Sequence, residues 1–368
     1  MTPETEAALA EIVKSAEGPL RIVGGGTRDI GAPVVGEALS TAGLSGVTLY
    51  EPGALTLVAQ AGTPVAEIEA VLAAEGQRLA FEPMDHRALL GTDGTPTIGG
   101  VVAANVSGPR RIQVGACRDS LLGVRFVDGM GCVLKNGGRV MKNVTGYDLV
   151  KLMAGSWGTL GVLSEVSLKV QAVPEAEATL VGRGMEAGAA VKVLSAALGS
   201  PYDVSGAAVS GDAALVRLEG LGDSVSYRVK RLLDAACAGW EVVEGEASAA
   251  LWRDVRDVTS FAGRAGTVWR VSVKPSDGPA LVAALGGPEA ILDWGGGLVW
   301  LLVEEDAAAR VRAEVARLGG HATLVRAPDA IRATIPAFQP EAAPLAAISR
   351  GLREKFDPRG ILNPGLMG

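Results

Sequence analysis

Residues 97–111 read TIGGVVAANVSGPRR, a run that has almost no bulk on its polar side. Such a stretch lets a long, flat ligand lie against the backbone, with Asn105 and Ser107 as hydrogen-bond donors. A Gly- and Ala-rich buried strand followed by a turn would leave the same pattern. Two more glycine-rich segments, one on either side of this run, help to choose between the interpretations.

The first of them follows a short apolar strand at residues 19–23 and reads Gly24-Gly25-Gly26-Thr27. Consecutive backbone N–H groups without side chains form an anion nest that suits a diphosphate. A Rossmann fingerprint would need a third glycine where Asp29 stands, and no P-loop Gly-Lys-Ser/Thr follows. A tight strand-to-turn transition explains the glycines equally well.

The second glycine-rich region comprises residues 142–148, KNVTGYD, and 155–161, GSWGTLG. Glycines at every third position, 155, 158 and 161, indicate a backbone that turns close to another group, although a plain surface loop is the alternative. Residues 162–170 then alternate apolar and polar side chains, which predicts a half-buried strand.

The remaining periodicity predicts an α+β chain with a boundary at Pro174. Before it we expect strands at 55–61, 124–127, 132–135 and 139–141, and a helix from residue 65 with Thr63 as its N-cap. Beyond it, the order βαββαβ occurs twice, at 178–243 and again at 267–326. Two such units side by side predict a broad antiparallel sheet with helices on one face.

Composition excludes several classes of function. The net charge is -7, so a nucleic-acid surface, which needs a basic footprint, is not expected. No apolar run reaches the roughly 18 residues that span a bilayer, and the polar N-terminus resembles no signal segment, so we expect a cytoplasmic protein. Three scattered cysteines and two histidines give no metal or iron–sulfur motif.

The order of motifs resembles a known family. IVGGGTRD, TIGGVVAANVSGPRR, GACRDSLLGVRFV, MKNVTGYDL, GSWGTLGVLSEVSLKV and a late FDPRGILNPG follow one another as in the vanillyl-alcohol-oxidase or PCMH-type FAD-binding fold. Within it, the chain is most similar to the FAD-binding subunits of bacterial glycolate oxidases. The resemblance implies a PCMH-type FAD-binding domain at 1–172, an α/β cap domain at 173–345 with the antiparallel sheet, and a segment at 346–368 that returns to the FAD domain.

The resemblance also implies FAD contacts at matched positions. They are Gly24, Gly25, Gly26, Thr27, Arg28, Asp29, Pro83, Thr97, Gly99, Gly100, Asn105, Ser107, Gly108, Arg110, Gly161, Val166 and Asn363. Many members of the wider fold tether flavin through a histidine near the first loop. Here Arg28 and Asp29 stand in that place, which implies that FAD is held non-covalently.

A 2-hydroxy-acid oxidase needs a cation for the substrate carboxylate and a base for the hydroxyl proton. Arg256 and Arg270 are candidates for the cation, although a solvated helix face or strand edge also explains them. His86 and His321 are the candidate bases, and a structural role would explain His321 as well. We predict no metal site.

The resemblance implies oxidation of glycolate to glyoxylate by hydride transfer to flavin, with electrons passed to partner subunits. The expected partners are a small 2-hydroxy acid, a second flavin subunit and an iron–sulfur subunit, with at most a peripheral, partner-mediated membrane association. Two alternatives remain open: a non-catalytic FAD-binding or electron-transfer partner of a catalytic flavin subunit, and a stand-alone oxidase of another 2-hydroxy acid such as D-lactate.

Overall fold

The computed structural model describes residues 1–139 and 146–367. The expected strand at 139–141 and the KNVTGYD motif at 142–148 therefore lie partly outside the described residues. The chain forms two compact units, the first made of Met1–Ser107, Gly115–Val173 and Pro340–Gly368, the second of Gly108–Val114 and Pro174–Gln339. Of the helices in the described ranges, none has the length and apolar content needed to cross a bilayer.

The first unit contains a five-stranded antiparallel sheet with the strand order β3-β4-β8-β6-β7. The strands are β3 (Val47–Glu51), β4 (Thr56–Gln60), β6 (Leu121–Val127), β7 (Val133–Gly137) and β8 (Val162–Lys169). The expectation that β8 is half-buried holds in part, because Glu165 and Lys169 are partly exposed, whereas Ser167 on the same side is buried. β8 lies between β4 and β6 in the middle of the sheet.

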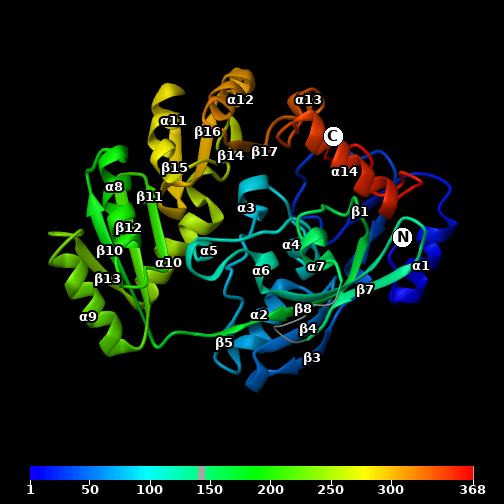
Figure 1. Ribbon diagram of the computed structural model, residues 1–368, viewed down its shortest axis with the longest axis horizontal. Coiled ribbons are helices and arrows are strands. Elements are labelled where there is room, and N and C mark those ends of the chain that lie inside the picture. The colour runs from blue at the N-terminus through cyan, green and yellow to red at the C-terminus, as the bar shows by residue number, and fades with distance from the viewer. Residues whose placement is uncertain (140–145, 368) are drawn as a thin grey trace. The chain divides into compact units, whose positions relative to one another are not determined.

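A second, smaller sheet carries the triglycine loop. Strand β1 (Leu20–Val23) pairs in parallel with β2 (Glu37–Ser40), and Leu362 bridges Leu20 in parallel. Helix α1 (Glu6–Ser15) buries Leu9 and Val13 in the same apolar cluster as Leu20 and Leu362. The C-terminal segment thus runs beside the strand that leads into the triglycine loop (Figure 1).

Short elements complete the first unit. They are α2 (Val65–Ala73), α3 (Arg87–Leu90), α4 (Ile98–Ala103), α6 (Cys117–Ser120), α7 (Leu149–Met153), α14 (Ala343–Phe356), β5 (Gln77–Arg78) and β9 (Gln171–Ala172).

The expectation that Thr63 caps α2 is wrong: Pro64 occupies the cap position without a side-chain bond. The Thr63 hydroxyl instead donates to the Gln60 carbonyl at 2.7 Å and accepts from the Gly46 N–H at 2.9 Å.

The second unit contains one eight-stranded antiparallel sheet, with the order β13-β10-β12-β11-β15-β16-β14-β17. The two βαββαβ repeats expected from the sequence are confirmed (Figure 1). The first half comprises β10 (Ala176–Arg183), α8 (Ala187–Leu198), β11 (Gly206–Ser210), β12 (Ala213–Gly220), α9 (Gly222–Leu233) and β13 (Glu241–Glu244). The second half comprises β14 (Thr267–Ser272), α11 (Gly278–Ala284), β15 (Glu289–Asp293), β16 (Leu298–Val303), α12 (Ala308–Arg317) and β17 (His321–Arg326).

One face of this sheet carries all four repeat helices, because α8, α9, α11 and α12 share a single apolar core with alternate strand residues. The intervening strand residues point to the opposite face. There, α10 (Gly245–Asp257) packs on the first half, and its Trp252 donates from Nε1 to Thr179 Oγ1 of β10 at 2.7 Å. The segment 108–114, with α5 (Arg111–Val114), also belongs to this unit.

Candidate functional site

A cavity of about 420 Å³ lies wholly within the first unit. It is lined by the triglycine loop, the start of α4, the turn before β8 and the C-terminal segment. It therefore brings together eleven of the residues for which cofactor contacts are expected: Gly24, Gly25, Gly26, Thr27, Arg28, Asp29, Thr97, Gly99, Gly100, Gly161 and Asn363. Segments more than 300 residues apart in the sequence thus form one wall.

The triglycine loop needs its glycines because it packs backbone to backbone against residues 94–97. A Cβ on Gly25 would lie 1.5 Å from the Thr95 carbonyl oxygen, and one on Gly24 would lie 2.5 Å from Thr97 Oγ1. Gly26 has φ +72° and open space around it, so it suits close approach of a ligand. The loop is therefore a tight turn, and its role as an anion nest stays a prediction that this geometry allows.

The first part of the run that begins at Thr97 forms a helix, α4 (Ile98–Ala103), and not the buried strand that was the alternative. Thr97 caps it by accepting from Gly100 N at 3.3 Å. Gly99 packs against Ala61, where a Cβ would lie 2.7 Å from the Ala61 carbonyl oxygen. Gly100 leaves space for Arg28, whose Nη1 atom lies 3.3 Å from the place a Gly100 Cβ would occupy.

Asn363 acts as a clamp between two walls of the cavity. Its Oδ1 accepts from Ile22 N of β1 at 2.7 Å, and its Nδ2 donates to the Trp157 carbonyl at 2.8 Å. Trp157, with φ +53°, donates its backbone N–H to Ala103 of α4 at 2.9 Å. This chain of bonds fixes the strand, the turn and the helix around the cavity.

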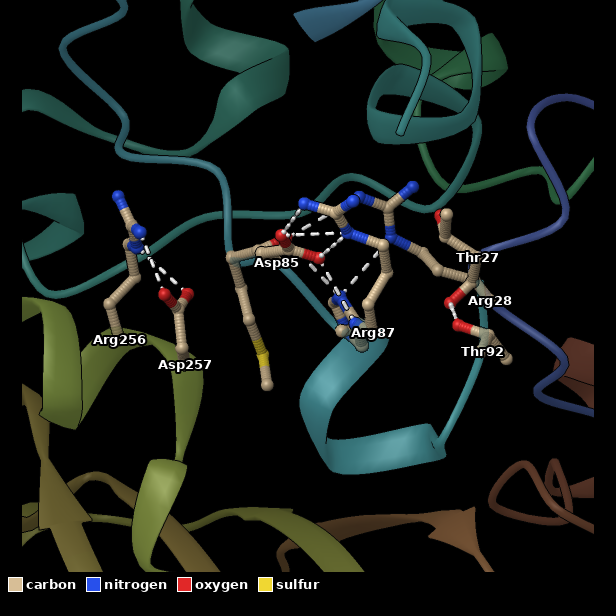
Figure 2. Close-up of polar contacts among 9 residues, drawn as sticks. Thr27, Arg28, Asp85, Arg87, Thr92, Arg256 and Asp257 are labelled. Carbon is tan, nitrogen blue, oxygen red and sulfur yellow. Dashed lines mark hydrogen bonds and ion pairs between the residues drawn. The ribbon is translucent and has the colours of Figure 1, made fainter. Parts of the chain in front are cut away.

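Arg28 is the half-buried cation of this cavity. Its Nε donates to His86 Nδ1 at 3.3 Å and its Nη2 to the Met84 carbonyl at 3.5 Å. Burial lowers the pKa of Arg28 to about 10, and the nearby Asp85 carboxylate opposes this. Asp85 is itself held by Arg87, with Nη2 to Oδ2 at 2.7 Å (Figure 2).

The wall beside Arg28 is pinned at Thr27, whose carbonyl accepts from Thr92 Oγ1 at 3.3 Å (Figure 2).

Six residues with expected cofactor contacts do not line the cavity: Pro83, Asn105, Ser107, Gly108, Arg110 and Val166. Asn105 and Ser107 instead accept from the first N–H groups of α6, those of Arg118 at 3.0 Å and Cys117 at 2.9 Å. Val166 is fully buried within β8. Arg110 lies in the second unit, in a buried ion pair with Glu219 of β12.

The candidate arginines of the second unit differ in their partners. Arg256 forms a two-pronged ion pair with Asp257, at 2.8 and 2.7 Å (Figure 2). Arg270 of β14 lies with its Cζ 5.2 Å from the centre of the Trp294 ring, and the Arg111 Cζ lies 4.4 Å from the same ring. Within the described residues, Arg270 makes no side-chain hydrogen bond or ion pair. Burial and the charge of Arg111 lower its pKa to about 10.

His321 faces the same side of the sheet as Arg270. It is paired across the strands with Ser272, and Arg270 is paired with Thr323, so the two side chains are diagonal neighbours. Burial, then Arg270 and Arg312, lower the pKa of His321 below its usual value. The described residues contain no cluster of three or more His, Cys, Asp or Glu that could hold a metal ion.

The sequence analysis predicts no functional role for Arg111 or Trp294. Nothing in the sequence links them, because 183 positions separate Arg111 from Trp294. The Trp294 Nε1 donates to the Gly108 carbonyl at 3.1 Å and so ties the segment 108–114 to the end of β15. The neighbouring arginines 110 and 111 are the available signal, but the sequence analysis assigns a role only to Arg110, as an FAD contact.

Comparisons with known proteins agree with this geometry. A family model described as an FAD binding domain matches residues 1–137. The glycolate oxidase subunit GlcE of Escherichia coli (strain K12) is 38% identical over 367 residues, which are 98% of this chain and 96% of that protein. The glycolate oxidase subunit GlcD of Bacillus subtilis (strain 168) is 34% identical over 141 residues, 38% of this chain and 28% of that protein.

Among solved structures, alkyldihydroxyacetonephosphate synthase has a TM-score of 0.69 at 17% sequence identity, over 99% of this chain and 76% of that one. At this identity the likeness concerns the fold alone. With the family model, it confirms the expected vanillyl-alcohol-oxidase or PCMH-type fold.

Proposed function

Because this chain belongs to the family of the glycolate oxidase subunit GlcE and is an FAD-dependent oxidoreductase, we propose that it oxidises glycolate to glyoxylate. FAD is its cofactor. When bound, FAD supplies the acceptor for the hydride that leaves the substrate carbon. The first unit serves as the FAD-binding domain, and the second provides the groups that recognise the substrate.

The residues of the cavity fit FAD. Side-chain-free backbone at Gly24 to Gly26 suits a diphosphate, and Arg28 supplies a positive charge beside it. Among the described residues that line the cavity there is no histidine, cysteine or tyrosine, which supports non-covalent attachment. Acid precipitation should therefore release all the flavin into solution.

Arg270 is the observation that carries the choice of a 2-hydroxy acid. A guanidinium that is stacked on an indole and has no ion-pair partner among the described residues leaves its donors available to a carboxylate. Arg111, on the same ring, adds a second positive charge. Arg256 was an equal candidate from the sequence, but Asp257 already neutralises it.

His321 is the group proposed to take the hydroxyl proton. Its lowered pKa keeps the imidazole neutral at pH 7, the state that a base requires. Its place on the same sheet face as Arg270 gives one substrate both a carboxylate partner and a base.

Electrons then leave through partners. The names of the two similar proteins describe each as a subunit, and the GlcD subunit shares similarity with a 141-residue stretch of this chain. We propose that a second flavin subunit and an iron–sulfur subunit complete the enzyme. A cytoplasmic location with at most peripheral membrane association stays a prediction.

An anaerobic titration of the purified, FAD-loaded chain tests the function. Glycolate should bleach the flavin absorbance of the wild type, and R270M should need at least about 100-fold more glycolate for the same bleaching, in line with the loss of a charged, two-pronged contact. R256M is the matched control and should behave as the wild type. Bleaching by D-lactate but not by glycolate would show that D-lactate is the substrate. A flavin that stays yellow with both acids, with and without partner subunits, would show that this chain does not catalyse the oxidation.

A further inference from the structure

The donors of Arg28 are divided between the protein and the cavity. A guanidinium carries five N–H groups. The protein uses two of them, Nε toward His86 Nδ1 and one Nη2 hydrogen toward the Met84 carbonyl. Three remain within the described residues, on a side chain that lines the cavity, which is enough for a two-pronged contact with phosphate oxygens.

Arg28 follows directly after the triglycine loop, and its Nη1 lies against Gly100 at the start of α4. Its guanidinium therefore stands beside the backbone nest for a diphosphate. The adjacent carboxylate, that of Asp85, is bound on both oxygens by Arg87, at 3.0 and 3.1 Å from Nε. The Asp85 carboxylate also favours the charged form of Arg28, so the guanidinium keeps its positive charge beside the cavity.

The contact with Arg28 also defines the state of His86, whose side chain is buried. Arg28 Nε can only donate, so this contact requires His86 Nδ1 to accept and the ring proton to lie on Nε2. Nδ1 also lies 3.3 Å from the Met84 carbonyl, a contact that would require the proton on Nδ1, and we assign the tautomer that satisfies Arg28. The imidazole is then neutral, and its one basic nitrogen is already engaged by Arg28. Because Nδ1 accepts from Arg28, it is not available to take a proton from a substrate, which argues against the catalytic base that the sequence analysis suggests at His86.

We propose that His86 is a positioning residue for FAD: by accepting from Arg28 Nε it directs the remaining guanidinium donors at the diphosphate. This inference rests on FAD binding in the cavity, and it gives His86 no contact with substrate. The function of the imidazole is to fix the rotation of a long side chain that would otherwise have to be ordered by the ligand itself.

Titration of the FAD-free full-length chain with FAD tests the proposal. H86L removes the acceptor and should weaken FAD binding about tenfold, while H86N, whose Oδ1 replaces Nδ1, should stay within about threefold of the wild type. R28M should weaken FAD more than H86L does, and the R28M/H86L double variant should equal R28M. The exposed Lys151 supplies the control K151M, which should bind FAD as the wild type does.

ADP has the adenosine diphosphate half of FAD and lacks the flavin, so it separates the two possible targets of Arg28, the diphosphate and the flavin ring. If Arg28 contacts the diphosphate, R28M weakens ADP as much as FAD. Unchanged ADP binding would overturn this assignment and place Arg28 against the flavin ring. Wild-type FAD affinity in H86L, or losses that multiply in the double variant, would overturn the role of His86.

A spectroscopic measurement keeps the proposal testable if H86L does not fold. The chain has only two histidines, so the ¹⁵N resonances of His86 are easily assigned, and Nδ1 should show the shift of an unprotonated acceptor. A protonated Nδ1 would overturn the proposal. Failure of the wild-type chain to bind FAD would instead overturn the FAD site as a whole, which is a distinct result.

Discussion

The two halves of the eight-stranded sheet share one topology but treat buried charge in opposite ways. In the first half, Glu219 lies between Arg110 and Arg217, all three nearly inaccessible to solvent. Arg228 of α9 donates to the carbonyls of Ser224 and Glu219 at 3.1 and 2.8 Å. In the second half, the guanidinium of Arg270 has the Trp294 ring beside it and no ion pair within the described ranges.

The difference lies on the sheet face opposite the four repeat helices. In the first half, α10 covers this face, and Trp252 stacks on Arg217 with 4.6 Å between its ring centre and Cζ. In the second half, the same face carries Arg270 and His321. Since a repeat that only supports the fold would neutralise its buried charges, we interpret the first half as structural and the second as the half that binds an anion.

The largest effect is expected at Glu219. E219Q leaves Arg110 and Arg217 buried without their carboxylate, and breaking a buried ion pair in this way costs about 3–5 kcal/mol of the free energy of unfolding. Urea unfolding measures it. E289Q, which breaks the exposed Arg264–Glu289 pair of the second half, is the control and should lose at most about 0.5 kcal/mol. Equal losses would erase the contrast between the halves.

A smaller loss is expected when the α10 contact is weakened. W252F removes the Nε1–H that Thr179 accepts at 2.7 Å in a buried position, at a cost of about 1–2 kcal/mol. W294F removes a bond to the Gly108 carbonyl at the partly buried Trp294 and should cost less than about 1 kcal/mol by the same reasoning. The reverse order, measured by thermal unfolding, would argue that α10 is not the cover of the first half.

Arg270 should behave unlike Arg217. R270M removes a charge that Asp293 favours without forming an ion pair and that Arg111 opposes, so the stability should change by at most about 1 kcal/mol. R217M removes a partner of Glu219 and should lose about 2–3 kcal/mol. Paired urea titrations compare the two variants. A loss in R270M as large as that in R217M would show that Arg270 is a structural residue.

The smallest effect concerns the pKa of His321, which burial, Arg270 and Arg312 lower. Because the folded-state pKa lies below the unfolded value, the unfolded chain binds more protons between the two. Stability from this group is therefore lost as the pH falls below about 6.5. R270M should raise the His321 pKa toward its usual value, as measured by NMR titration, and leave the His86 signal unchanged. An unchanged His321 pKa in R270M would show that Arg270 does not influence the charge of His321.

The sequence predicted best those parts of the fold that depend on local backbone conformation. The triglycine loop and the two βαββαβ repeats depend on glycine conformations and hydrophobic periodicity, which are local properties. Contacts between side chains that are distant in sequence could not be predicted. Glu219, for example, is 109 residues from its partner Arg110. Asn105 and Ser107 likewise have the chemistry of ligand donors, but whether such groups meet a cofactor or the first N–H groups of α6 depends on tertiary packing alone.

The clamp made by Asn363 has a consequence for biosynthesis. Ile22 and Asn363 are 341 residues apart, so a ribosome has translated nearly all of the chain before the wall between β1 and the Trp157 turn can close. Nascent and prematurely terminated polypeptides would expose an unfinished pocket. Capture of the yellow cofactor would then mark, on each molecule, that translation has passed residue 363.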